Sequence, residues 1–222
     1  MPKAKRSRKP ARRQAKIRVL LLETQLPARL TFSTRRQIPF MEELLRPFTG
    51  LELIPERVHS RSDLKKFLNV ARRNPRIRVV HIVSHGEYSP KRPVIVLTGD
   101  EKINLADREG RNLFRGLHGK VLLFSCCEIG GNDELMRALL KISRAKAIFS
   151  YTDTVTDRQA LITEALFYHL AHRHFSGRES TQALRNVHEQ LRIVLHFVGI
   201  DKNRDSLTYP LFAADFAEDL RR

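Results

Sequence analysis

Short apolar segments alternate along this chain with longer amphipathic segments, and this alternation restricts the fold more than any other feature of the sequence. Apolar runs rich in β-branched residues occupy residues 16–23, 51–58, 76–84, 120–125 and 145–150. Apolar residues at helical spacing fill residues 36–48, 60–73, 133–143, 157–174 and 180–198. Strands that alternate with helices are typical of a parallel sheet covered on both sides. We therefore predict an α/β fold, a three-layer sandwich with a mostly parallel central sheet and helices on both faces.

Local features add detail to this prediction. Residues 94–98 and 102–105 flank a Gly-Asp-Glu turn, which is the pattern of a small hairpin. Pro55 cannot donate a backbone hydrogen bond, so its strand is expected at an edge of the sheet. A short helix is expected at residues 111–117, where a helical pattern ends at His118-Gly119.

Length and composition fit a single domain with an N-terminal tail. The chain has 222 residues, of which 41% are hydrophobic and 29% charged, an ordinary globular mixture. Its uninterrupted apolar runs are only about five residues long, too short for a membrane span or a signal peptide. We expect residues 16–222 to form one domain behind a disordered basic tail at residues 1–15. The pattern at 208–216 is ambiguous between strand and helix.

Positive charge is concentrated at the N-terminus. Lysine and arginine number 41 against 24 acidic residues, a net charge of +17, and residues 1–16 alone contain eight basic residues and no acid. Such a tail can bind nucleic acid without sequence preference, an acidic membrane surface or an acidic partner. It can equally be a solubilising extension, because charge alone identifies no partner.

The only two cysteines, Cys126 and Cys127, are adjacent in the sequence. Their Cα atoms are about 3.8 Å apart, closer than an ordinary disulfide allows. A disulfide framework is therefore excluded, and a reducing, cytoplasmic location is expected.

Two reactive groups follow predicted strands. His85 stands in Ser84-His85-Gly86, and Cys127 comes directly after the strand at 120–125. The carboxyl ends of parallel strands collect ligands and reacting groups at one edge of the sheet. A cysteine in a turn before a helix is activated towards thiolate, and a nearby histidine can act as its general base. The adjacent glycines let a substrate backbone approach, and the N–H groups of Gly86 and Cys127 can stabilise an oxyanion. The pattern favours acyl transfer from a peptide or other amide.

The segments VVHIVSHG at residues 79–86 and VLLFSCCEIG at residues 121–130 resemble the caspase-like cysteine peptidases of clan CD, most closely the CHAT branch. The resemblance covers about residues 76–175 and implies a caspase-like three-layer sandwich and cysteine endopeptidase activity on a protein substrate. It also implies a separate regulatory or sensor protein, in a bacterial signalling or defence setting. No cofactor or metal is needed for this chemistry.

The resemblance assigns roles to individual residues. His85 would be the catalytic histidine and Cys127 the nucleophile, because Glu128 and Gly130 occupy the +1 and +3 positions of the CHAT pattern. Glu128 and Gly130 would support the nucleophile loop, with Glu128 alternatively capping the following helix. Cys126 should face the core, since successive strand residues alternate in direction.

The specificity pocket departs from the family. Phe124–Glu128 does not match the caspase motif Gln-Ala-Cys-x-Gly, which argues against a caspase with a strict aspartate preference. CHAT sequences often carry a tryptophan after the next strand, where this chain has Tyr151-Thr152-Asp153. Asp153, with Ser150, would bind a basic P1 residue; alternatively Asp153 is a turn residue.

Other histidines have structural explanations. His81 is expected to be a packed core residue, and His169 and His172 lie near a helix C-terminus, where positive charge is favourable. The alternative to a peptidase is a catalytically silent caspase-like binding module whose basic tail holds nucleic acid or another polyanion.

Overall fold

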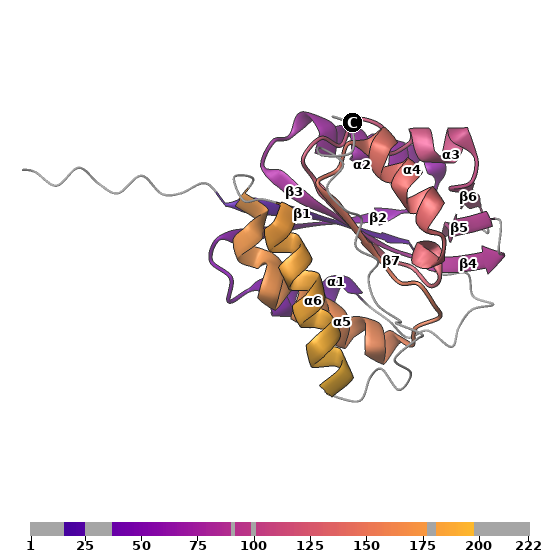
Figure 1. Ribbon diagram of the computed structural model, residues 1–222. Helices are drawn as coiled ribbons and strands as arrows, with labels where there is room; N and C mark the ends of the chain where they lie inside the picture. The colour runs from indigo at the N-terminus through magenta and orange to yellow at the C-terminus, as the bar shows by residue number, and fades with distance from the viewer. Residues whose placement is uncertain (1–15, 25–36, 90–91, 99–100, 177–180, 198–222) are drawn as a thin grey trace, which may run out of the picture.

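Figure 1 shows the computed structural model, which describes residues 16–24, 37–89, 92–98, 101–176 and 181–197. The basic tail at 1–15 and the ambiguous segment at 208–216 lie outside this range. No helix in the described part of the chain is long and apolar enough to cross a membrane.

A five-stranded parallel sheet forms the centre of the molecule. The strands are β1 (Ile17–Thr24), β2 (Leu51–Val58), β3 (Ile77–Val83), β7 (Val121–Ser125) and β8 (Ala147–Ser150). They lie in the order β2-β1-β3-β7-β8, and every neighbouring pair is parallel. Pro55 is therefore on an edge strand, as predicted.

Helices cover both faces of this sheet (Figure 1). One face is covered by α2 (Arg61–Arg73), α3 (Arg108–Asn112) and α4 (Asp133–Ser143), with Leu64, Leu68 and Leu139 in the core beneath. The other face is covered by α1 (Gln37–Leu45), α5 (Asp157–Ala171) and α6 (Thr181–Phe197), with Met41, Phe167 and Leu191 in the core. The predicted three-layer α/β sandwich is confirmed. We call these the α2–α4 side and the α5 side.

Local signals in the sequence explain where the helices begin. The Ser60 side chain accepts from the Asp63 N–H, and the Asp63 carboxylate returns a bond to the Ser60 N–H, so a capping box starts α2. Thr156 and Gln159 form the same arrangement at the start of α5. The regular part of α5 ends at Ala171, earlier than expected, and the chain continues as a 3₁₀ turn over His172–Ser176.

A second, antiparallel sheet stands beside the first. It contains β4 (His85–Ser89), β5 (Arg92–Val96) and β6 (Lys102–Asn104), in that order. The β5–β6 pairing confirms the predicted hairpin. The strand β4 was not predicted, because His-Gly-Glu-Tyr-Ser lacks the β-branched residues typical of strands and forms one by pairing with β5. The predicted helix at 111–117 begins earlier, and its regular part is α3.

Candidate active site

The register of two neighbouring strands brings the predicted catalytic residues to one edge of the sheet. Val83 of β3 lies opposite Ser125 of β7, and the Ser84 N–H extends this ladder by donating to the Ser125 carbonyl at 3.2 Å. His85 and Cys127 each follow the paired residue by two positions. The strands are direct neighbours, so the chain segments that carry the histidine and the cysteine lie side by side.

Gly86 makes the closest contact between these segments. A Cβ atom placed on Gly86 would lie 2.0 Å from the Cys127 carbonyl oxygen and 2.8 Å from the Cys127 nitrogen. Glycine is thus the residue that allows this approach. The predicted oxyanion-hole pair, Gly86 and Cys127, is therefore in backbone contact.

The two cysteines face opposite sides of the sheet. Cys126 is 1% exposed within the apolar core of the α2–α4 side, and its Sγ–H donates to the Ile82 carbonyl at 3.8 Å. Cys127 is half-buried, and its Sγ–H donates at 3.6 Å to the carbonyl of Val155, just before α5. Both thiols are free. The packing matches the choice of Cys127 over Cys126 as the exposed thiol.

The loop that carries the nucleophile is tied to the segment after β8. Glu128 has φ 59° and ψ −1°, in the left-handed region that is uncommon for residues other than glycine. Its N–H donates to the Asp153 carbonyl at 3.1 Å, and its carboxylate accepts from the Thr154 hydroxyl at 2.5 Å. The Gly130 N–H donates to the Tyr151 carbonyl at 2.7 Å. Glu128 does not cap the next helix, because the Asn132 side chain does so.

The two predicted specificity residues differ in exposure. Asp153 is exposed, and its Oδ1 accepts from the Thr154 N–H at 2.7 Å, so it makes the turn contact considered above. Ser150 is 1% exposed, and its hydroxyl is buried without a hydrogen bond. By strand alternation Ser150 shares the α2–α4 side with Ile148, whereas Cys127 contacts the α5 side. Only Asp153 has surface with which to meet a substrate at this edge.

A buried carboxylate beneath the site was missed by sequence reasoning. Glu164 of α5 is fully buried and accepts hydrogen bonds from the Ser125 hydroxyl and the Gln37 amide. The Tyr151 hydroxyl donates to the same carboxylate at 3.4 Å. Glu164 therefore links the end of β7, the segment after β8 and α1. The signal was present, because position 164 falls in the buried stripe of α5 between Ala160 and Phe167/Tyr168.

His81 joins this network and is a core residue, as expected. It is fully buried, with Nδ1 3.1 Å from the Tyr168 hydroxyl and Nε2 3.4 Å from Glu164 Oε2. Burial, and then the charge of Glu164, raise the pKa of Tyr168 well above its usual value, so the phenol keeps its proton. A tyrosine that donates to Nδ1 leaves the imidazole proton on Nε2, beside the carboxylate.

Within the described ranges, no group of three or more His, Cys, Asp or Glu side chains could hold a metal ion. The Nδ1 of His172 lies 2.8 Å from the carbonyl oxygen of His169. His172 thus caps the end of its own helix, in line with the structural explanation given to these histidines.

Comparisons with known proteins give little beyond the fold. No protein-family model and no curated protein matches the chain. Among solved structures, it is similar to the crystal structure of the Drosophila initiator caspase Dronc, with 10% sequence identity and a TM-score of 0.49. The match covers 88% of this chain and 78% of that chain. A likeness of this size says nothing about activity.

Proposed function

We propose that this protein is a cysteine endopeptidase of the CHAT or caspase-like type, which cleaves a protein substrate through a Cys127–His85 dyad. The observation that carries the proposal is the backbone contact between Gly86 and Cys127, at the carboxyl ends of two adjacent parallel strands. A half-buried thiol, a half-buried imidazole and two backbone N–H groups are then within one small region. These are the parts that acyl transfer requires.

The chemistry follows from these groups. His85 accepts the proton of the Cys127 thiol, and the thiolate sulfur attacks the carbonyl carbon of the scissile peptide bond. The N–H groups of Gly86 and Cys127 stabilise the negative charge on the carbonyl oxygen. The C–N bond then breaks, and the leaving amine takes the proton from imidazolium. Water, deprotonated by His85, attacks the thioester, and the carboxylate product leaves as the thiol is restored.

The proposed substrate preference is a basic residue at P1. Asp153 is exposed beside the nucleophile loop, because its carbonyl accepts from the Glu128 N–H. A carboxylate has two oxygens, so its bond to the Thr154 N–H is compatible with an ion pair to lysine or arginine. Ser150 has no exposed surface with which to add a contact.

Regulation belongs to a separate protein in this proposal. The connection between β7 and β8 consists of the nucleophile loop and α4, so it contains no long linker for activation by cleavage. We infer that a partner protein controls the site, in the cytoplasm and in a bacterial signalling or defence setting.

The test is labelling with acyloxymethyl ketone probes that differ at P1, with the modified residue identified by mass spectrometry. Labelling should occur at Cys127, disappear in Cys127→Ala, collapse in His85→Ala and survive in Cys126→Ala. Probes with lysine or arginine at P1 should react fastest, and Asp153→Asn should remove that preference. A Cys127 thiol no more reactive than free cysteine, with candidate partners present, would refute the peptidase and leave the binding module.

A further inference from the structure

A patch of positive charge lies away from the proposed site, on the α2–α4 side. One shallow hollow of about 410 Å³ runs along α2, and a second of about 350 Å³ lies between the turn after α3 and the end of α4. The first is lined by Ser62, Lys65, Lys66, Asn69, Val70 and Arg73, and the second by Arg115, Gly116, His118, Lys141, Ile142 and Arg144. None of these lining residues is acidic. We call their six lysines and arginines the basic face.

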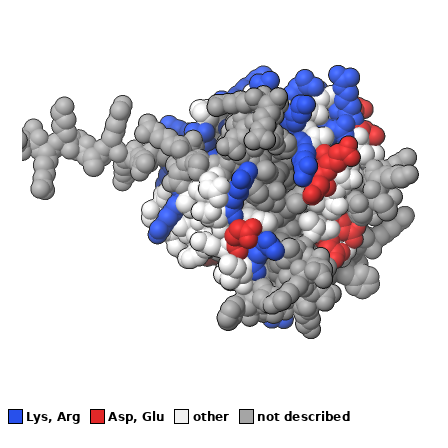
Figure 2. Space-filling model, in the orientation of Figure 1, with Lys and Arg blue, Asp and Glu red and all other residues white. Residues whose placement is uncertain are grey.

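Arg72 makes the two hollows parts of one surface. Its Nε donates to the Arg115 carbonyl at 2.6 Å, and its other guanidinium nitrogens donate to the Leu113 carbonyl and the Asn69 side chain. Asn69 lines the first hollow and Arg115 the second. Figure 2 shows lysine and arginine side chains gathered along the upper rim of the molecule, over α2, α3 and α4 as they lie in Figure 1.

The charges of the basic face are not neutralised within the described part of the protein. Its six lysines and arginines are all exposed, and none of them forms an ion pair there. Exposed arginines elsewhere on the surface do have acidic partners: Arg46 pairs with Glu43, Arg137 with Asp133 and Arg192 with Glu189. Mutual repulsion disfavours such a cluster unless an anionic partner offsets it.

The helix macrodipole explains only part of this set. Arg73 and Lys141 are in the last turns of α2 and α4, where a cation is favourable. Lys65 and Lys66 are in the first half of α2, and Arg115 lies outside any regular helix. These three positions have no such reason to be basic.

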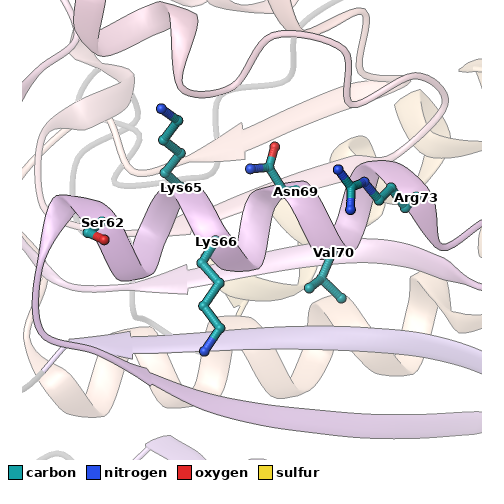
Figure 3. Close-up of a pocket in the computed structure, with 6 residues that line it drawn as sticks. All are labelled: Ser62, Lys65, Lys66, Asn69, Val70 and Arg73. Carbon is teal, nitrogen blue, oxygen red and sulfur yellow. The ribbon is translucent and has the colours of Figure 1, made fainter.

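The arrangement of the cations fits an extended polyanion rather than a compact ligand. Figure 3 shows the side chains of Lys65 and Lys66 extending from α2 in opposite directions, so they do not converge on one small anion. From Lys65 to Arg73 the helix rises about 12 Å, a length over which duplex DNA carries about seven phosphate charges. The lining residues include no aromatic ring on which an unpaired base could stack.

We propose that the basic face binds the phosphate backbone of double-stranded nucleic acid, without sequence preference and independently of residues 1–16. The net charge of +17 steers a polyanion to the protein, and the basic face is where the structure offers unneutralised cations. Each lysine or arginine that contacts a phosphate releases a counterion, so the affinity falls steeply with salt. This binding is separate from the proposed peptidase activity and from its site.

The experiment measures fluorescence anisotropy of a labelled short duplex DNA with the full chain, between about 50 and 200 mM salt. The test variant is Lys65→Gln/Lys66→Gln/Lys141→Gln. The matched control is Arg46→Gln/Arg158→Gln/Arg173→Gln, which removes the same number of exposed charges from α1, α5 and the turn after it. Thermal melting checks that both variants fold, as exposed substitutions of this kind should.

The test variant should lose about 0.9 units of salt-dependence slope for each phosphate contact, or 2 to 3 in total. Its affinity at about 100 mM salt should fall at least about tenfold, whereas the control should stay near wild type. Equal losses in the two variants would overturn the proposal in favour of the N-terminal tail. Tighter binding to polyglutamate or to single-stranded DNA than to duplex would overturn it in favour of a different partner.

Discussion

The contact between Gly86 and the Cys127 backbone makes Gly86→Ala the sharpest test of the proposed site. The added Cβ would lie 2.0 Å from the Cys127 carbonyl oxygen, against about 3.4 Å for the start of ordinary van der Waals contact. The two chain segments must therefore separate by about 1.4 Å, the difference between these distances. The clash is with backbone, so a change of side-chain rotamer cannot relieve it.

The expected effects on stability and activity differ in size. Overpacking of this kind destabilises a fold by about 1–3 kcal/mol. A displacement of about 1 Å at a catalytic centre lowers the rate by about 100-fold. We expect kcat/KM, or the rate of Cys127 labelling, to fall by about 100-fold in the folded protein, well beyond what partial unfolding explains.

Two glycines supply matched controls. A Cβ on Gly110 would lie 1.9 Å from the Asn104 carbonyl oxygen, the same kind of clash, at α3 and the end of β6. A Cβ on Gly50 would meet nothing within 4 Å. Gly110→Ala should lose a similar amount of stability in urea unfolding while keeping the wild-type labelling rate per folded molecule. Gly50→Ala should change neither quantity.

The result that would refute this reasoning is a folded Gly86→Ala protein that labels at the wild-type rate. Such a protein would mean that the spacing of the two strand ends does not matter for Cys127, and the proposed dyad would lose its principal support. Equal losses of labelling in Gly86→Ala and Gly110→Ala would attribute the effect to stability alone.

Three further predictions concern the surroundings of the site and the sheet. Glu164→Ala should destabilise the fold by about 3–5 kcal/mol in urea unfolding, because Ser125 and its other partners lose their acceptor, and Glu164→Gln should lose clearly less; equal losses would contradict this. Burial, and then the charge of Arg78, lower the pKa of Lys120 to about 8, so between pH 8 and 10.5 the unfolded chain binds more protons and stability rises with pH, by at most about 3 kcal/mol. The stability difference between wild type and Lys120→Met should grow across that window, and a constant difference would count against it. Thr156→Ala should lower stability by about 1 kcal/mol, since it removes the cap of α5, and an unchanged melting curve would contradict that role.

Sequence periodicity predicted the layers and the position of the pair of reactive groups, for a physical reason. Buried parallel strands are apolar runs, and their carboxyl ends are marked by the first polar or glycine residues. The end of β3 at Ser84-His85-Gly86 and the end of β7 at Cys126-Cys127 were visible in this way. That these strands are direct neighbours required the register Val83↔Ser125, which arises from tertiary pairing.

The features missed by sequence depend on partners distant in the chain. The strand β4 has weak intrinsic preference and exists through its pairing with β5. Glu164 has the composition of a surface position on an amphipathic helix, and only Ser125 and Gln37, from other elements, make its burial tolerable. Ser150 was a candidate for substrate contact because it ends a strand, but its parity on β8 directs it into the opposite core.

The central sheet separates the two proposed activities, and this separation can be tested. The Cys127 sulfur contacts the α5 side through Val155, whereas the basic face is on the outer surface of the α2–α4 side. The thickness of a helix, about 10 Å, exceeds the Debye length of about 8 Å at physiological salt, so charge on one side is screened from the other. Lys65→Gln/Lys66→Gln/Lys141→Gln should therefore keep the wild-type labelling rate of Cys127, and Cys127→Ala should bind duplex DNA like wild type. A change of labelling rate on adding DNA to the wild type, absent in the triple variant, would show instead that β7 couples the two faces, since Cys126 and Cys127 are adjacent and face opposite sides.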